Sequence, residues 1–387
     1  MKIELAKTEI IHFVGIGGIG MSGLANIMKG LGFKVQGSDI ALNKNIERLK
    51  KNKIKVYIGH STKNLNNSTI LVISSAVKNT NTEVAYAKKK NLPIYKRGDV
   101  LAHIVSLLKR NIVVAGSHGK TTTTSLISAI FSKTKLDPTI INGGVLNSFN
   151  NSAKLGKGDW CILESDESDG SFVQVSPTYS IITNIDQEHM DYYKNMRTIK
   201  ELFIKFIEKT PSFGKSFICL DDLNNKEIIK KVKIKNFHTY GTDINSQFRI
   251  KNVSQYKEFS IFNINIKLPG KKNYTIYNIK IPLLGLHNIR NATAAVAVAT
   301  TIGISNKIIK QALREFKGVE RRFNKIFTFK DAVYFDDYAH HPTEIKELLK
   351  GVRAVYKNEE VICVFQPHRI SRLKNLKKEF SLSFNKA

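Results

Sequence analysis

The chain has 387 residues, a length that predicts two or three domains, each able to bury its own core. Its 61 Lys and Arg against 32 Asp and Glu give a formal net charge of +29, but the excess is mostly lysine spread over the whole chain. Because no arginine-rich arm or aromatic-interleaved basic stripe stands out, we expect no nucleic-acid partner, with attraction of anionic substrates as a secondary gain.

The three cysteines, Cys161, Cys219 and Cys363, lie far apart beside apolar residues. This pattern is typical of buried thiols in a reducing compartment, and it excludes a disulfide framework or a cysteine metal site. The N-terminal residues run straight into a strand and predict no signal peptide, and no apolar run reaches a membrane-spanning length. We therefore expect a cytoplasmic protein with no membrane insertion.

Residues 10–40 predict a strand, a glycine-rich turn, a helix and a second strand. The turn has the spacing of a nucleotide-binding βαβ unit, carried by Gly15, Gly17 and Gly20. Asp39 ends the second strand, where an acidic residue often holds a ribose hydroxyl. A nucleotide diphosphate at the helix N-terminus is expected, and the pattern alone does not distinguish NAD, FAD or a nucleotide sugar. Strand-like segments at 70–77 and 92–101 continue the α/β alternation.

The chain is organised around residues 112–124, where a short apolar strand runs into a glycine turn and the start of a helix. Such a turn points backbone N–H groups and the positive end of a helix at one spot, where a phosphate chain fits. The Lys120 ammonium adds charge, and the Thr121 hydroxyl can ligate Mg²⁺. The loop reads Gly-x-x-Gly-Lys-Thr-Thr, tighter than the general phosphate-loop pattern. It predicts nucleoside triphosphate binding.

Two later strands end in groups that favour a cation. The apolar strand at 160–164 ends in four carboxylates within six residues: Glu164, Asp166, Glu167 and Asp169. Clustered acids repel one another unless a cation is present, so Glu164 is a candidate Mg²⁺ ligand, with a solvated acidic loop as the alternative. His189 follows the strand at 179–185 and is a candidate for a second metal or a phosphate, with a structural histidine as the alternative.

The last third of the chain offers polar groups at the ends of predicted elements. Residues 200–285 contain no catalytic constellation. Asn288 and Asn291 lie three apart at the start of a small, apolar helix, so both amides can face one ligand, with capping as the alternative for Asn288. Strands at 332–337 and 360–365 suggest another parallel sheet. Arg369 and Arg372, one helical turn apart, could clamp a small carboxylate.

Eight segments, taken together, resemble the Mur ligases of peptidoglycan synthesis over the whole chain. In order they are HFVGIGGIGMSGLA, AGSHGKTTTT, ESDESDGSF, TNIDQEHMDYY, GLHNIRNATAA, GVERRF, DDYAHHPTEI and FQPHRISRL. The resemblance implies a three-domain α/β architecture: a Rossmann-like domain for the uridine nucleotide (1–108), a central P-loop ATPase-like domain (109–318) and a C-terminal Rossmann-like domain for ATP and the amino acid (319–387). Family members continue well past FQPHR, so the third domain is expected to be incomplete.

The resemblance implies an ATP-dependent ligase that adds L-alanine to UDP-N-acetylmuramate in cytoplasmic peptidoglycan precursor synthesis, with Mg²⁺ as cofactor. ATP would phosphorylate the lactyl carboxylate, and the amine of alanine would attack the acyl phosphate. A carboxylate is a poor electrophile until one oxygen becomes a phosphate leaving group. The alternatives are a dinucleotide-dependent oxidoreductase, a Mur ligase that recycles murein peptide, and a nucleotide-binding chain too short to be active.

The resemblance also implies roles for residues at matching positions. The ATP site would comprise Gly116, Ser117, His118, Gly119, Lys120, Thr121, Thr122, Asn291, Arg322 and Asp337. Catalysis would rest on Lys120, Glu164 and His189, with one Mg²⁺ held by Thr121 and Glu164 and a second by His189. The UDP-sugar site would comprise Gly15, Gly17, Gly18, Gly20, Met21 and Ser22, beside Asp39. The alanine pocket would comprise Tyr338, His340, His368, Arg369 and Arg372. Ser117 and Glu188 depart from the commoner Thr and Asp, and both keep the chemistry.

Overall fold

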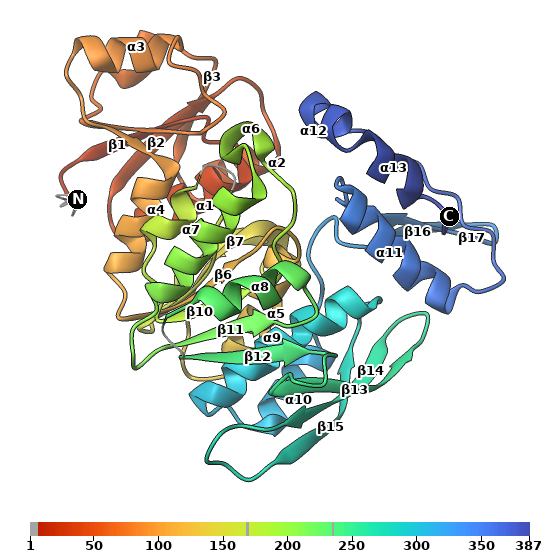
Figure 1. Cartoon of the computed structure of the whole chain (residues 1–387). Helices are drawn as coiled ribbons and strands as arrows, with labels where there is room; N and C mark the ends of the chain where they lie inside the picture. The colour runs from red at the N-terminus through yellow and green to blue at the C-terminus, as the bar shows by residue number, and fades with distance from the viewer. Residues whose placement is uncertain (1–6, 168–169, 234–235) are drawn as a thin grey trace. The chain divides into compact units, whose positions relative to one another are not determined.

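The computed structural model describes residues 7–167, 170–233 and 236–387. The chain divides into two compact units, residues 1–111 with 136–163 and residues 112–135 with 164–387. Both units consist of strands and helices in alternation (Figure 1), so the predicted α/β class is confirmed. Among the described helices, none is long and apolar enough to cross a membrane.

A five-stranded parallel sheet in the order β3-β2-β1-β4-β5 lies at the centre of the first unit. Its strands are β1 (Ile10–Val14), β2 (Lys34–Asp39), β3 (Lys55–Ile58), β4 (Ile70–Ile73) and β5 (Ile94–Lys96). Its helices are α1 (Ile19–Gly30), α2 (Lys44–Lys51), α3 (Thr82–Lys89), α4 (Arg97–Ser106) and the 3-10 turn η1 (Thr62–Leu65). The βαβ unit predicted over residues 10–40 is confirmed. The strand order reverses at β1, and open α/β sheets bind ligands at the carboxyl end of such a strand.

The strand predicted at 92–101 is wrong beyond Lys96, because α4 begins at Arg97. Asp99 Oδ2 accepts a hydrogen bond from the Lys96 backbone N–H at 2.8 Å and closes the first turn of the helix. The buried residues of α4 then recur at helical spacing: Val100, Leu101, Ile104 and Val105.

Three further strands complete the first unit: β7 (Thr139–Leu146), β8 (Asn151–Lys154) and β9 (Trp160–Glu164), whose last residue belongs to the second unit. β7 pairs in parallel with β9 and antiparallel with β8. Ala153 of β8 lies against Gly23 of α1, where a Cβ would approach the alanine methyl to 3.1 Å. The absent side chain therefore lets the helix pack closely on β8.

A buried polar network lies under the glycine-rich turn of the first unit. Glu83, His12 and Ser38 are all fully buried. Glu83 accepts hydrogen bonds from the Ser38 hydroxyl at 2.5 Å and the Asn64 amide at 2.7 Å. The Ser38 carbonyl in turn accepts the backbone N–H groups of Gly15 and Ile16 at 2.9 and 3.0 Å. Burial alone would raise the pKa of Glu83, but His12, Ser38 and Asn64 outweigh it and lower the pKa to about 2.

Replacing Glu83 by glutamine is expected to lower the free energy of unfolding at pH 7 by about 3 kcal/mol. Because the folded pKa lies below the unfolded value, the carboxylate stabilises the fold above a pH of about 4.5, and this contribution is lost as the pH falls toward 2. Urea unfolding at pH 7 and at low pH measures both effects. Glu47→Gln, at an exposed site, is the matched control. An equal loss for both variants would contradict the role of the network.

The second unit contains strands in the order β15-β14-β13-β12-β11-β10-β6. They are β6 (Arg110–Ala115), β10 (Tyr179–Ile182), β11 (Lys215–Cys219), β12 (Phe237–Gly241), β13 (Phe248–Gln255), β14 (Ser260–Ile266) and β15 (Tyr274–Ile281). Neighbouring strands among β6, β10, β11, β12 and β13 pair in parallel, and β13, β14 and β15 form an antiparallel meander. The carboxyl ends of β6 and β10 therefore lie at the same edge of the sheet, where the phosphate loop and the predicted His189 turn begin.

The helices of this part are α5 (Lys120–Ser132), α6 (Met190–Tyr193), α7 (Met196–Glu208), α8 (Leu223–Lys231), α9 (Leu286–Ile302), α10 (Asn306–Arg314) and the 3-10 turn η2 (Ser171–Gln174). The small, apolar helix predicted after residue 285 is α9. It packs along α5, because its buried face consists largely of alanine: Ala292, Ala294, Ala295, Ala297 and Ala299. This contact places the start of α9 beside the phosphate loop.

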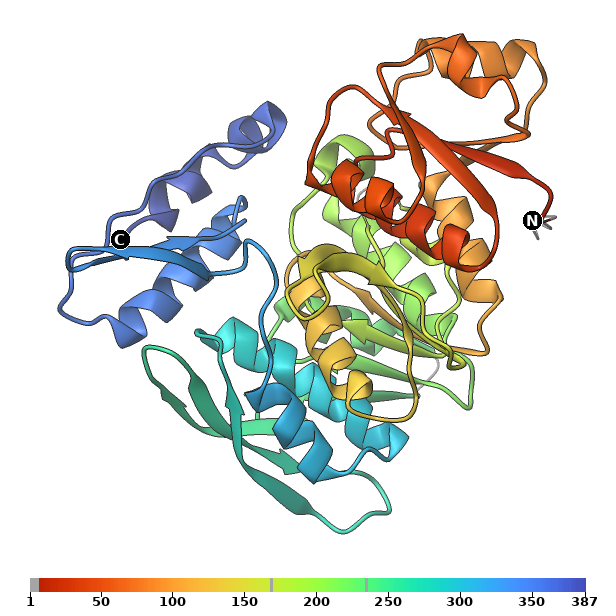
Figure 2. The same ribbon diagram turned by 180° about the vertical axis from the view of Figure 1, so that it is seen from behind.

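The C-terminal segment, residues 321–387, consists of the hairpin β16 (Asn324–Phe329) and β17 (Ala332–Asp336) with α11 (Pro342–Val355), α12 (Ile370–Asn375) and α13 (Lys377–Ser383). The hairpin lies next to α11 in both views (Figures 1 and 2). The parallel sheet expected here is wrong: β17 pairs antiparallel with β16, and residues 360–365 form no strand. A strand needs a neighbour for its N–H and C=O groups, and no described strand lies beside this stretch. Cys363 is accordingly exposed, contrary to expectation, whereas Cys161 and Cys219 are buried.

Candidate functional site

The phosphate loop leads from β6 into α5, as the sequence predicts, and it depends on two glycines. Gly116 has φ +134°, and a Cβ there would lie 2.1 Å from Thr183 Oγ1. Gly119 has φ +82° and forms the N-terminal cap of α5, and a Cβ there would lie 2.6 Å from Asn291 Oδ1. A side chain at either position would displace the loop or its neighbour.

The loop is fixed to the segment that follows β10. The Ser117 N–H donates to the Asn184 carbonyl at 3.0 Å, and the His118 N–H donates to Asn184 Oδ1 at 2.9 Å. The Ser117 hydroxyl accepts the Asp186 N–H at 2.8 Å. Ser117 lies in the loop as predicted. Its hydroxyl, however, holds the loop in place through Asp186.

Lys120, in the first turn of α5, lies against a buried carboxylate. Its Nζ is 2.8 Å from Glu167 Oε2 and donates to the carbonyls of Gly116 and Ser117 at 2.6 and 3.0 Å. Burial would lower the pKa of Lys120, but Glu167, Glu164 and Asp166 outweigh it and hold the pKa well above its usual value. The ammonium is therefore charged and oriented across the mouth of the loop.

The predicted cation ligands fall into two adjacent groups. Thr121 Oγ1 donates to Glu164 Oε1 at 3.1 Å, so these two come together as expected. His189, predicted for a second ion, groups with Asp166 and Glu167, and the ligand atoms of these three residues all lie within 4.8 Å of one another. Asp169, the fourth carboxylate of the sequence cluster, lies outside the described residues.

Glu167 is the member of this cluster that sequence reasoning did not select. Both of its carboxylate oxygens are buried without a well-directed hydrogen bond. Burial raises its pKa above the usual value, although the Lys120 ammonium opposes the shift. Such a group gains from a second positive charge, and carboxylate and hydroxyl oxygens are the donors that Mg²⁺ prefers. The residues present therefore fit a divalent cation. The four-carboxylate pattern signalled the cluster, but which acid is buried depends on the tertiary fold.

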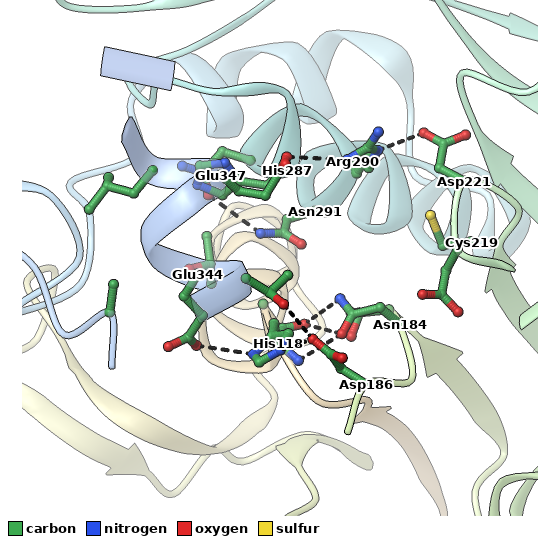
Figure 3. A pocket seen from close by; sticks show the side chains of 18 of the residues that line it. His118, Asn184, Asp186, Cys219, Asp221, His287, Arg290, Asn291, Glu344 and Glu347 are labelled. Atoms are coloured by element: carbon green, nitrogen blue, oxygen red, sulfur yellow. Dashed lines mark hydrogen bonds and ion pairs between the residues drawn. The ribbon is translucent and has the colours of Figure 1, made fainter. Parts of the chain in front are cut away.

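A cavity of about 470 Å³ opens beside the loop in the second unit (Figure 3). Its volume suits a small-molecule ligand. It is lined by six of the residues predicted to bind ATP: His118, Gly119, Thr122, Asn291, Arg322 and Asp337. Asn288 also lines it, although its amide donates to the Leu284 carbonyl at 2.8 Å in a local helix contact.

Asp221 and Arg290 form another wall of this cavity and were not predicted from the sequence. Arg290 Nε donates to Asp221 Oδ2 at 2.6 Å, and Asp221 also accepts the backbone N–H groups of Thr242 and Asp243. Arg290 directly precedes Asn291 in the sequence, so it could have been predicted to lie at the same site. No motif around Asp221 indicates a role for this residue.

The Asp337 carboxylate is half-buried and joins two loops of the C-terminal segment. Its two oxygens accept the backbone N–H groups of Phe323 at 2.8 Å and Ala339 at 2.6 Å. Burial raises its pKa to about 6, although Arg322 opposes the shift. Asp337, predicted to contact ATP, lines the cavity, and its oxygens already have backbone partners there.

The residues predicted for alanine fall into an aromatic cluster, Tyr338, His340 and His368, and two arginines that line a second, small cavity. The His340 ring is tilted against that of Tyr338 and edge-on to that of His368, with ring centroids 4.8 and 6.1 Å apart. Arg369 and Arg372 line a cavity of about 30 Å³ with residues 187–191. Arg369 Nη1 lies 3.3 Å from His189 Nδ1.

Arg372 is not free to pair with Arg369 around one carboxylate. Its Nη2 donates to Glu188 Oε1 at 2.5 Å, and its Nη1 donates to the His368 carbonyl at 3.2 Å. Both Arg372 and Glu188 are buried. The structure therefore assigns Arg372 to an internal ion pair and leaves Arg369 as the guanidinium nearer the loop.

The predicted UDP-sugar loop lies in the first unit between β1 and α1. Gly18 caps α1 without a side-chain hydrogen bond, and the first turn of the helix carries no acid, so its N–H groups suit an anion. Asp39 Oδ2 accepts the Gly17 N–H at 2.7 Å, which ties Asp39 to the loop itself. Met21 and Ser22 are buried, and the Ser22 hydroxyl donates to the Ile19 carbonyl. These two would reach a ligand through their backbone only.

Models of known protein families match three successive stretches of the chain. Residues 10–109 match "Mur ligase family, catalytic domain", residues 114–299 match "Mur ligase middle domain", and residues 321–386 match "Mur ligase, glutamate ligase domain".

Curated proteins and solved structures agree with these matches. The UDP-N-acetylmuramate–L-alanine ligase of Pelagibacter ubique is 73% identical over 387 residues, 100% of this chain and 83% of the relative. The protein of that name from Bartonella bacilliformis is 42% identical over 390 residues, 100% of this chain and 81% of the relative. The structure of UDP-N-acetylmuramate-alanine ligase MurC from Thermotoga maritima matches with a TM-score of 0.83 and 29% identity, covering 97% of this chain and 83% of that one. A murein peptide ligase from Psychrobacter arcticus matches with a TM-score of 0.78 and 25% identity, covering 93% and 79%.

Proposed function

The chain belongs to the Mur ligase family, and we propose that it joins L-alanine to UDP-N-acetylmuramate while ATP is cleaved to ADP and phosphate. The observation that carries the proposal is the 73% identity, over the full chain, to a relative named for this reaction. Membership of this family argues against the oxidoreductase alternative. A ligase accounts for the phosphate loop and the acidic cluster as well as for the first βαβ unit, whereas an oxidoreductase accounts only for the last of these. We propose that this reaction belongs to peptidoglycan precursor synthesis in the cytoplasm.

We propose that the three family stretches divide the work as the sequence predicts. Residues 1–108 would bind the UDP sugar through the glycine loop of α1, residues 109–318 would bind ATP, and residues 319–387 would contribute to the ATP and alanine sites. The matched stretches, 10–109, 114–299 and 321–386, support this division.

The geometry of the second unit supports phosphoryl transfer followed by amide formation. The phosphate loop would hold the triphosphate with its N–H groups, and Lys120 would neutralise charge on the transferred phosphate. Thr121 and Glu164 would hold one Mg²⁺, and His189 with Asp166 and Glu167 would hold a second, and the ions would supply further neutralisation of phosphate charge. Asn291, Arg322 and Asp337 would position the nucleoside in the 470 Å³ cavity. The amine of alanine would then displace phosphate from the acyl phosphate.

Phosphate release by the purified 387-residue chain, with ATP, Mg²⁺ and UDP-N-acetylmuramate, tests the proposal. We expect release that depends on added L-alanine. Replacing alanine with L-alanyl-γ-D-glutamyl-meso-diaminopimelate tests the murein-peptide alternative in the same assay. Release with the tripeptide alone would assign the chain to peptide recycling, and ATP binding without release would support an inactive nucleotide-binding protein.

Replacing Arg369 by alanine is expected to raise the KM for L-alanine by about tenfold or more, because a guanidinium paired with a carboxylate is lost. The KM values for ATP and UDP-N-acetylmuramate should change little. Lys374→Ala, which removes an exposed cation from the same helix α12, is the control. An unchanged KM for alanine would remove Arg369 from the amino-acid site.

A further inference from the structure

The side chain of His118 points out of the phosphate loop toward two carboxylates (Figure 3). Its Nε2 lies 3.0 Å from Asp186 Oδ2, and its Nδ1 lies 3.3 Å from Glu344 Oε1. Asp186 follows β10, and Glu344 lies in the first turn of α11 in the C-terminal segment. One side chain therefore bridges the nucleotide loop and the C-terminal segment.

The backbone of His118 is held on both sides by the segment that follows β10. Its N–H donates to Asn184 Oδ1, and its carbonyl accepts hydrogen bonds from the Thr183 hydroxyl at 2.7 Å and the Asn184 amide at 3.0 Å. The next residue is Gly119, whose backbone conformation only glycine adopts readily. The loop backbone that carries the ring is therefore fixed, and the ring reaches the two carboxylates from it.

The start of α11 receives this bridge through several contacts. Glu344 closes a capping box by accepting the backbone N–H groups of His340 at 3.0 Å and His341 at 3.3 Å. The Thr343 hydroxyl donates to Asp186 Oδ2 at 2.6 Å. The His341 ring lies 4.6 Å from the His118 ring. Glu344 thus faces His118 with the same carboxylate that organises the helix end.

The charges around His118 favour its protonated form. Burial would lower its pKa, but Asp186 and Glu344 outweigh burial and raise the pKa to about 10. The other titratable groups facing this cluster are Glu188, whose charge acts in the same direction, and His341, whose pKa burial lowers. An imidazolium between two partly buried carboxylates is a charge-assisted link.

We infer that His118 is a positioning residue that locks the C-terminal segment against the phosphate loop, so that ATP binding and docking of this segment reinforce each other. The inference rests on the proposed function for its nucleotide. Both ring nitrogens of His118 face protein carboxylates, so the ring contacts the C-terminal segment and leaves the phosphates to the loop N–H groups. Arg322 and Asp337, which line the nucleotide cavity, belong to the segment that the link holds. By linkage, anything that weakens docking must weaken nucleotide binding.

A double-mutant cycle on the full chain tests this inference. The variants are His118→Gln, Glu344→Gln and the double variant, with Lys346→Gln on the exposed side of α11 as control. Calorimetry gives the Kd of a non-hydrolysable ATP analogue with Mg²⁺. We expect each single variant to raise this Kd about tenfold, and the double variant to be little weaker than either one, because both remove the same link. Effects that multiply, or a wild-type Kd in both single variants, would overturn it.

Tryptic cleavage of the nucleotide-free proteins gives a second, independent readout. Lys317 and Arg321 are exposed at the junction before the C-terminal segment. We expect faster cleavage there in His118→Gln and in Glu344→Gln than in the wild type or Lys346→Gln, because an undocked segment opens more often. Equal rates in all four proteins would overturn the docking role. If the wild type binds no nucleotide, the proposed function fails, whereas these rates still decide the docking role. Thr343→Val replaces His118→Gln should the latter not fold.

Discussion

Replacing Lys120 by alanine is expected to lower the rate of alanine-dependent phosphate release by at least about 10³-fold. The ammonium is fixed by the Gly116 and Ser117 carbonyls and by Glu167, and we propose that it neutralises the charge on the transferred phosphate. Because the ammonium is already oriented in the folded protein, removing it removes stabilisation of the transition state directly. The rate with saturating substrates measures the effect.

The same variant leaves the Glu167 carboxylate buried without its cation, which costs stability. We therefore expect a lower Tm for Lys120→Ala, with the secondary structure retained in circular dichroism. The control is Lys133→Ala at the end of α5, which breaks an exposed ion pair with Glu315 and should change neither rate nor Tm appreciably. A Lys120→Ala enzyme of near wild-type rate would end the assignment of the phosphate loop.

The parts of the site that the sequence predicts are those fixed by neighbouring residues. The strand, the two glycines and Lys120 lie within a dozen positions, and local backbone geometry alone brings them together. The same holds for the glycine turn after β1. In such segments the pattern of apolar residues, glycines and charges determines the conformation directly.

The partners of these residues come from distant parts of the chain and were not predicted. Lys120 meets Glu167, His118 meets Glu344, and Arg372 meets Glu188 through tertiary contacts. The sequence placed Arg372 in an arginine clamp, because spacing along a helix says which side chains share a face but not what lies opposite that face. The parallel sheet predicted from residues 332–337 and 360–365 is wrong for a related reason, because an apolar stretch does not specify which strand it pairs with.

Replacing Glu167 by glutamine is expected to lower turnover by about 10²-fold or more and to raise the Mg²⁺ concentration for half-maximal rate by at least about tenfold. The carboxylate is buried, lies 2.8 Å from Lys120, and shares a cluster of ligand atoms with Asp166 and His189. Glutamine keeps the size and one oxygen but loses the charge. The rate measured as a function of free Mg²⁺ reports both effects.

Two roles for Glu167 give different results in that titration. If it only orients Lys120, Glu167→Gln lowers the rate at every Mg²⁺ concentration and leaves the half-maximal concentration unchanged. If it also holds the ion, that concentration rises, and excess Mg²⁺ restores part of the rate. The exposed Glu201→Gln on α7 is the control for charge alone. Combining Glu167→Gln with Lys120→Ala should cost less than the product of the single effects, because the two side chains form one buried ion pair whose loss is counted once.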